Sequence, residues 1–189
     1  MVFSSAPLQK MIQFYNFKLM FFIPGWLISV LTFPGVIIHE WAHKKYCDWT
    51  GVPVHQVVYF RIGNPAGYVV HEQPKKYNQI FWISAGPLII NSLLAIVISY
   101  FATQTQPESF LYYILFWVAI SSGMHAFPSD HDAQHIFNES KSLLKNGGSI
   151  LHYLAYPFYA LIWLANKLRF FWFDLWYAIA LVSFGGLAI

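Results

Sequence analysis

Long apolar segments constrain the fold of this chain more than any other feature of its sequence. A helix needs about 20 apolar residues to cross a bilayer, and only helices and closed barrels satisfy their backbone hydrogen bonds in lipid. We therefore predict membrane-spanning helices at residues 19–49, 80–101, 110–127, 150–165 and 170–187. The turn that joins the last two is very short, so a single hairpin that crosses only part of the membrane is the alternative for them.

The composition agrees with a membrane protein. Hydrophobic residues make up 57% of the 189 residues and charged residues 10%, which is too few charges to cover a soluble domain of this length. Aromatic residues make up 20%, and such rings collect at membrane interfaces. The net charge of +3 is scattered, with no basic run typical of nucleic-acid binding. We expect a mainly α-helical, polytopic membrane protein with one domain over residues 1–189, in contact with the lipid bilayer and not with nucleic acid.

Three stretches outside the apolar segments have patterns of their own. Residues 1–18 place apolar residues around Lys and Gln, which predicts a short helix on the membrane surface. Residues 51–79 hold two β-branched and aromatic runs around Gly63-Asn64-Pro65-Ala66-Gly67, which predicts a small β-hairpin between the first two spans. Residues 128–148 are polar and follow the third span.

The basic residues predict an orientation for the spans, because cytoplasmic loops are enriched in Lys and Arg. If the loops after the first and third spans share one side, that side holds seven basic residues, namely Lys44, Lys45, Arg61, Lys75, Lys76, Lys141 and Lys145. The opposite side holds four, namely Lys10, Lys18, Lys167 and Arg169. We therefore expect residues 51–79 and 128–148 in the cytoplasm, so that the ends of the first and third spans approach the same membrane face.

The sequence His39-Glu40-Trp41-Ala42-His43 lies in the last part of the first apolar segment. Residues four apart share one face of a helix, so His39 and His43 can both turn a ring nitrogen to one metal ion. Zinc binds imidazole readily and keeps a position for water in catalytic sites, and Glu40 is then placed as general base. Such a short pattern also arises by chance, but ionisable residues at membrane depth are costly and are functional by default.

A catalytic zinc usually has three protein ligands, and this pattern supplies two. The candidates for the third lie near the end of the third span and are Asp130, Asp132, His125, His131 and His135. The single cysteine, Cys47, falls four residues after His43 and is a further candidate, with a buried apolar thiol as the alternative. Spacing alone does not choose among these residues.

Three motifs follow one another along residues 36–136: the HExxH pattern at His39, then Ser84-Ala85-Gly86-Pro87-Leu88 with Asn91, then Pro128-Ser129-Asp130. Together they resemble the site-2 protease family of intramembrane zinc metalloproteases. The resemblance implies a three-helix metalloprotease core, here followed by a two-helix C-terminal extension. It also implies zinc held by His39, His43 and Asp130, with Glu40 as the catalytic base and Asn91 near the substrate.

The third motif departs from the family pattern. Ser129 stands where the family has Leu, His131 stands where it has Gly, and Asp132 follows as a second acid, so Asp132 stays the alternative ligand. The second motif also has a plainer explanation. Pro87 suits the first turn of a helix, and Asn91 suits a hydrogen bond between helices.

The resemblance implies a zinc-dependent endopeptidase that cuts membrane-spanning segments of other proteins, with its active site toward the cytoplasm. The hairpin would correspond to the family's membrane-associated sheet, whose edge holds an extended substrate. Two other classes remain open. The chain is alternatively a membrane protein that uses zinc for structure or transport, or a zinc hydrolase of a non-peptide amide or lipid, because HExxH specifies activated water and not the group attacked.

Overall fold

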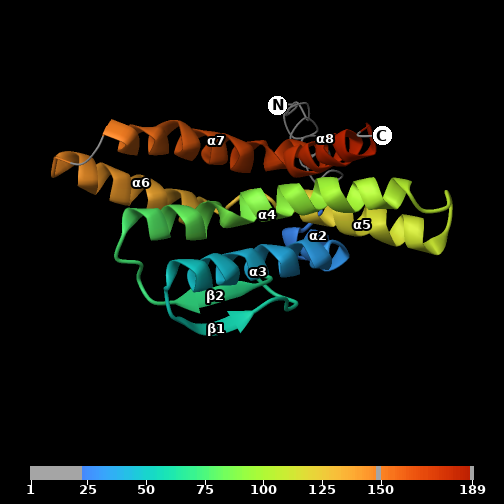
Figure 1. The fold of residues 1–189 in the computed structure, drawn as a ribbon, viewed down its shortest axis with the longest axis horizontal. Coiled ribbons are helices and arrows are strands. Elements are labelled where there is room, and N and C mark those ends of the chain that lie inside the picture. The colour runs from blue at the N-terminus through green and yellow to red at the C-terminus, as the bar shows by residue number, and fades with distance from the viewer. Residues whose placement is uncertain (1–22, 148–149, 188–189) are drawn as a thin grey trace, which may run out of the picture.

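The chain folds mainly into α-helices with one small β-sheet (Figure 1). The computed structural model describes residues 23–147 and 150–187, so the surface helix predicted at residues 1–18 lies outside the described residues. In chain order the elements are α2 (Gly25–Leu31), α3 (Phe33–Thr50), β1 (Val54–Val58), β2 (Tyr68–His71), α4 (Tyr77–Thr103), α5 (Phe110–Met124), α6 (Asp130–Lys145), the 3-10 helix η1 (Ile150–Leu154), α7 (Ala155–Leu168), η2 (Arg169–Phe171) and α8 (Phe173–Leu187). The predicted helical class and the predicted hairpin are confirmed.

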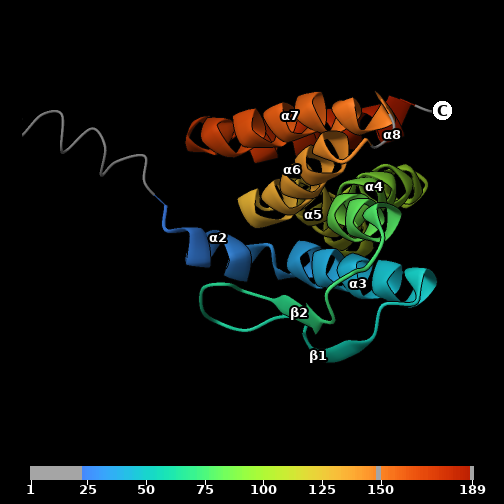
Figure 2. The ribbon, with the colours of Figure 1, turned by 90° about the vertical axis from the view of Figure 1, so that its left-hand side faces the viewer.

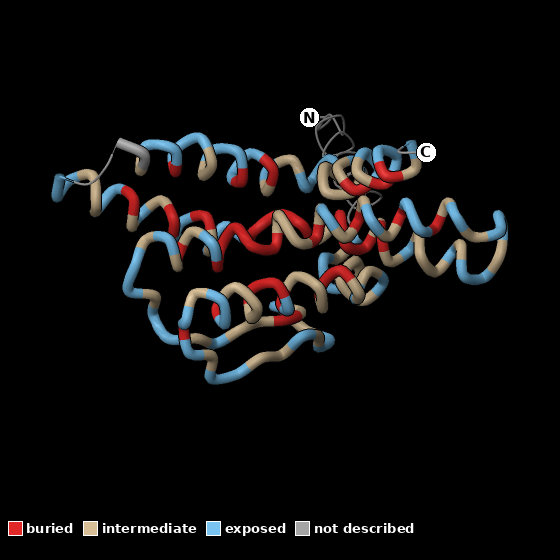
Figure 3. The backbone as a smooth tube through the Cα atoms, in the orientation of Figure 1, coloured by how far each residue is buried: buried red, intermediate tan, exposed pale blue. Residues whose placement is uncertain are grey.

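Helix α3 lies between the hairpin and helices α4 to α8 in both ribbon views (Figure 1, Figure 2). Helices α3, α4 and α5 pack against one another, and α8 packs against α4 and α5. Helix α6 contacts α4 and pairs with α7. Buried residues gather where the core helices face each other (Figure 3). The motifs singled out in the sequence therefore lie on helices that meet: the first on α3, the second on α4 and the third at the start of α6.

One helix, α4, is long and apolar enough to cross a membrane by itself. Two further spans result if each of two bent pairs counts as one: α2 with α3, bent by 90°, and residues His152–Phe171 with α8, bent by 101°. Helix α5 is apolar but has only 15 residues. Among the described residues, one to three candidate spans thus stand against five predicted segments. The segment predicted at 19–49 is broken, and those at 150–165 and 170–187 belong to one bent pair.

Pro34 explains the break between α2 and α3. A proline has no N–H for the carbonyl four residues earlier and clashes with it, whereas in the first turn of a helix this N–H is not needed. Helix α2 ends at Leu31, and α3 begins at Phe33 with Pro34 in its first turn. The chain therefore turns sharply just before the helix that carries the HExxH pattern.

Helix α5 fixes this bend with two side-chain hydrogen bonds. Trp117 Nε1 donates to the Leu31 carbonyl at 2.9 Å. The Thr32 hydroxyl donates to the Ile28 carbonyl at 2.6 Å, so its oxygen accepts from His125 Nε2, 2.7 Å away. Both bonds come from residues distant in sequence, and they hold the start of α3 against α5.

Small residues let the core helices approach one another closely. At three glycines a side-chain carbon would collide with the backbone of a neighbouring helix: Gly35 with the Ser121 carbonyl, Gly123 with Ala178, and Gly185 with the Ile96 carbonyl. These contacts join α3 to α5, α5 to α8 and α8 to α4. Close packing at small residues is how helices associate in lipid, where the hydrophobic effect does not drive them together.

Asn91 joins three helices at the centre of this core. Its side chain is fully buried on α4, and Nδ2 donates to the Gly35 carbonyl of α3 at 3.1 Å and to the Ser122 carbonyl of α5 at 3.2 Å. The Ser122 hydroxyl in turn donates to the Asn91 carbonyl at 2.8 Å. Asn91 therefore makes the helix–helix hydrogen bonds that were one of its two sequence interpretations, and the structure places it in the packing of α3, α4 and α5.

Gly35→Ala should destabilise the protein, because the added carbon meets the Ser121 carbonyl of α5, and overpacking typically costs about 1–3 kcal/mol. Thermal unfolding in detergent measures the effect. Gly25→Ala is the matched control, since no atom lies within 4 Å of the added carbon there. Equal melting temperatures for the two variants would contradict the close approach of α3 and α5.

Candidate metal centre

His39 and His43 point their rings at each other from one face of α3. The two Nε2 atoms lie 3.1 Å apart, and the ring centroids lie 4.8 Å apart. Helix α3 runs without a break from Phe33 to Thr50, so the two histidines are separated by one regular helical turn. The pairing of His39 and His43 that their four-residue spacing predicts is therefore present in the structure.

A backbone carbonyl holds the other ring nitrogen of each histidine. His39 Nδ1 donates to the His125 carbonyl at 2.6 Å, and His43 Nδ1 donates to the Ile83 carbonyl at 2.8 Å. Because a carbonyl oxygen only accepts, each Nδ1 carries the proton and each neutral ring keeps its lone pair on Nε2. Two lone pairs then face each other across 3.1 Å, an arrangement that a cation stabilises and that is repulsive without one.

Asp132 completes the group from α6. Its Oδ2 lies 3.8 Å from His43 Nε2, and the ligand atoms of His39, His43 and Asp132 all lie within 4.8 Å of one another. The three side chains are therefore grouped closely enough to hold one metal ion. Donor atoms around a tetrahedral zinc lie about 3.3 Å apart, so the two histidine nitrogens already have this separation and the Asp132 carboxylate would move closer to them.

The start of α6 orients the Asp132 carboxylate. Ser129 is the N-cap: its hydroxyl accepts from the Asp132 N–H, and its own N–H donates to Asp132 Oδ2 at 3.0 Å. Burial raises the pKa of the Asp132 carboxyl, and hydrogen bonds from Ser129 lower it. Those hydrogen bonds favour the ionised carboxylate, which is the form that binds a cation.

Asp130, the third ligand implied by the resemblance, is not part of this group. Its Oδ1 accepts from Asn166 Nδ2 of α7 at 2.6 Å, so the carboxylate fastens α6 to α7. The alternative, Asp132, is the acid that lies beside the histidines. A signal for it exists in the sequence, because Asp132 precedes Ile136 by four residues and Ile136 lies on the buried face of α6.

The other candidate ligands have other neighbours. His125 contributes its backbone carbonyl, while its ring is hydrogen-bonded to Thr32. The rings of His131 and His135 lie 5.3 Å apart and line a small cavity. Cys47 is buried against Val52 and Ile83 as an apolar side chain.

Glu40 is buried beneath the loop of the hairpin. Its residue is 9% exposed, and a side-chain carbon at Gly67 would lie 2.5 Å from Glu40 Cγ. The same carbon would lie 3.0 Å from the Tyr59 and Val58 carbonyl oxygens, so the loop has no space for a larger residue there. Glu40 follows His39 directly on α3, and the hairpin loop keeps its carboxyl out of bulk solvent.

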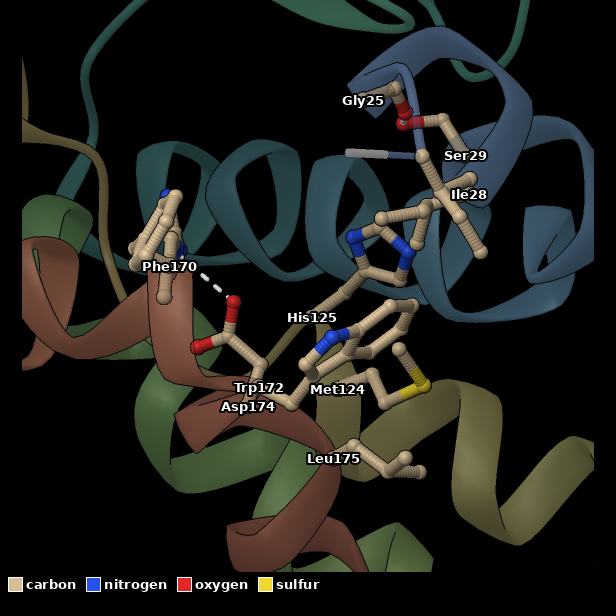
Figure 4. A pocket seen from close by; sticks show the side chains of 11 residues that line it. Gly25, Ile28, Ser29, Met124, His125, Phe170, Trp172, Asp174 and Leu175 are labelled. Atoms are coloured by element: carbon tan, nitrogen blue, oxygen red, sulfur yellow. Dashed lines mark hydrogen bonds and ion pairs between the residues drawn. The ribbon is translucent and has the colours of Figure 1, made fainter. Parts of the chain in front are cut away.

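Two cavities lie near the group and differ in character. The smaller one, of about 80 Å³, is lined by Asp132 together with His71, Pro74, Ile80, Ile83, Ser84, His131 and His135. A cavity needs about 10–15 Å³ to hold one water, so this one has room for several beside the Asp132 carboxylate. The larger one, of about 490 Å³, lies between α2 and the corner joining η2 to α8 (Figure 4). Only His125 links it to the metal group, since His39, His43 and Asp132 do not line it.

Comparison of the chain with models of protein families, with curated proteins and with solved structures found no match. The geometry of the site is therefore the basis for its interpretation.

Asp132→Asn should lower metal affinity strongly, whereas Asp130→Asn should leave it close to wild type, because only the Asp132 carboxylate faces the histidine pair. Elemental analysis and zinc titration of purified variants measure this. The His39→Ala, His43→Ala double variant gives the level expected without a site. Loss of zinc on Asp130→Asn with retention on Asp132→Asn would reverse the assignment.

Proposed function

We propose that this chain is a membrane-embedded zinc-dependent endopeptidase of the site-2 protease type. The observation that carries the proposal is the convergence of three ligand atoms, two Nε2 atoms and one carboxylate oxygen, beside a buried glutamate on the same helix as the histidines. Three protein ligands are typical of catalytic zinc, whereas structural zinc sites are usually closed by four. The described residues supply three.

Each residue of the site has a role in peptide hydrolysis under this proposal. His39, His43 and Asp132 would hold the ion. Zinc bound there would polarise the scissile carbonyl and lower the pKa of a bound water to about 7. Glu40 would take a proton as the water oxygen attacks the carbonyl carbon, and would return it to the nitrogen as the C–N bond breaks. The buried setting of Glu40 keeps this proton transfer within the site.

The surroundings support a peptide as substrate and water as second reactant. The cavity lined by Asp132 gives water a place next to the ligands. The hairpin packs on α3, and with two strands it has an unpaired edge on each. An extended segment can add to such an edge as a further strand, which exposes its carbonyls, while a helix keeps them hydrogen-bonded. The substrate class we propose is therefore a membrane-spanning or membrane-proximal segment of another protein.

We place this site toward the cytoplasmic face of a multi-pass membrane protein. The support is the seven basic residues at the end of α3, in the hairpin segment and in α6, against four predicted on the opposite side. The hairpin and α6 lie at the same end of α4 (Figure 1). The loop from α4 to α5 lies at the opposite end. Zinc hydrolysis of a non-peptide amide would use the same ligands, so a panel of single-span protein substrates with and without a chelator is the direct test.

Glu40→Gln should keep zinc and the fold but lose about 10²–10⁴-fold in turnover, because the amide has nearly the same shape and cannot accept the proton. Single-turnover cleavage of a membrane-spanning peptide measures it. Glu108→Gln, in the loop between α4 and α5, is the matched control and should cleave as wild type does. Unchanged turnover in Glu40→Gln would remove Glu40 as the base.

Single cysteines at Gln104 and Lys141, each in a Cys47→Ser background, should react with an impermeant thiol reagent from opposite sides of the membrane. Gln104 directly follows α4, and Lys141 belongs to α6, which lies at the other end of α4 (Figure 1). Labelling in sealed vesicles of known orientation measures it. Reaction of both cysteines from one side would contradict a membrane crossing by α4.

A further inference from the structure

Pro87 lies inside α4, where a proline removes one hydrogen bond from the helix. In an α-helix the N–H of each residue bonds to the carbonyl four residues earlier, so the missing N–H of Pro87 leaves the Ile83 carbonyl without a helical donor. Pro87 is fully buried and Ile83 is 3% exposed. A buried carbonyl without a hydrogen-bond donor is costly, so this one needs a partner from outside its own helix.

His43 supplies the donor that the helix lacks. Its Nδ1 lies 2.8 Å from the Ile83 carbonyl. That bond fixes the proton on Nδ1 and turns Nε2 toward His39 Nε2, at 3.1 Å, and toward Asp132 Oδ2, at 3.8 Å. The partner of a ligating histidine sets its tautomer and orientation, and losing that partner typically costs 10–100-fold in metal affinity.

Gly86 makes this contact possible by bringing α4 close to α3. A side-chain carbon at Gly86 would collide with the ring of Tyr46, which lies three residues after His43 on α3. Gly86 and Pro87 thus act together: the glycine allows the approach, and the proline frees the carbonyl that the approach brings to His43.

We propose that Pro87 is a positioning residue of the metal centre: by lacking an N–H, it reserves the Ile83 carbonyl for His43 Nδ1. This inference rests on the proposed metal site for its consequence, but the hydrogen bond itself does not require bound metal. His39 obtains the same kind of partner without a proline, because the His125 carbonyl lies at the C-terminal end of α5, where helical carbonyls have no helical donor.

Two replacements of Pro87 distinguish the effect of its missing N–H from the effect of its ring. Pro87→Ala restores an N–H that can bond to the Ile83 carbonyl in competition with His43. Lactic acid in place of Pro87 joins the chain through an ester and removes the ring without restoring the N–H. The proposal expects the ester variant to behave as wild type and Pro87→Ala to differ from both. Pro157→Ala, at an exposed position in the first turn of α7, controls for proline replacement elsewhere.

Nitrogen NMR of histidine-labelled, metal-free protein reads the His43 tautomer directly. Wild type, the ester variant and Pro157→Ala should carry the proton on Nδ1, whereas Pro87→Ala should show a mixture of tautomers and bind zinc 10–100-fold more weakly. Its melting temperature should not fall, because a helix interior favours Ala over Pro. A merely structural role for Pro87 would move the melting temperature and not the tautomer.

Different results test the role of Pro87 and the proposed zinc site. Retention of the Nδ1 tautomer and of zinc affinity in Pro87→Ala would overturn the proposal, and so would a changed tautomer in the ester variant. If Pro87→Ala does not fold, the ester variant still tests the proposal, because a changed His43 tautomer in that variant would overturn it. Failure of the wild-type protein to bind zinc would instead overturn the proposed function, while the tautomer measurement would continue to test the hydrogen bond from His43 to Ile83.

Discussion

The hydrogen bonds from His39 and His43 to backbone carbonyls connect the candidate metal centre to the packing of the helices. Each imidazole is held between its own position on α3 and a carbonyl on a different helix, α5 for His39 and α4 for His43. The distance between the two Nε2 atoms is therefore set by how α3, α4 and α5 pack. This gives the close contacts at Gly35 and Gly86 a second effect besides stability, because a shift of either helix would move a ligand nitrogen.

The cost of burying polar groups explains why the Nδ1 atoms of His39 and His43 both have a hydrogen-bond partner. An unsatisfied polar group in an apolar interior costs several kcal/mol in lipid, so histidines on an apolar helix need partners even before any metal binds. The carbonyls that serve as partners are ones that helices leave free, one at the end of α5 and one four residues before Pro87. The same bonds satisfy the backbone and select the tautomer that a metal requires.

Local pattern predicts most of the fold and part of the site. The spacing of His39 and His43 suffices for their pairing, and the turn residues 63–67 suffice for the hairpin. The third ligand depends on more than local pattern. Asp130 and Asp132 differ by about 200° around α6, so which of them faces α3 is decided by the rotation of that helix, which the Ser129 cap and the burial of Ile136 determine. The sharp bend at Thr32 is not predicted by composition, because apolar residues continue through it, whereas the bend near Trp172 lies close to the turn predicted between residues 165 and 170.

The bend at Thr32 also contributes to the site through a chain of hydrogen bonds. Pro34 ends the preceding helix, and the Thr32 hydroxyl then donates back to Ile28 and accepts from the His125 ring. That bond orients His125 at the end of α5, and the carbonyl of the same residue accepts from His39 Nδ1. The bend before Pro34 thus helps to orient His125, whose carbonyl is free because α5 ends there, while Pro87 on α4 frees the carbonyl that pairs with His43. The interruptions in these helices are consequently part of what positions the candidate ligands, since in an uninterrupted α4 the Ile83 carbonyl would bond to the residue at position 87 and have no need of His43.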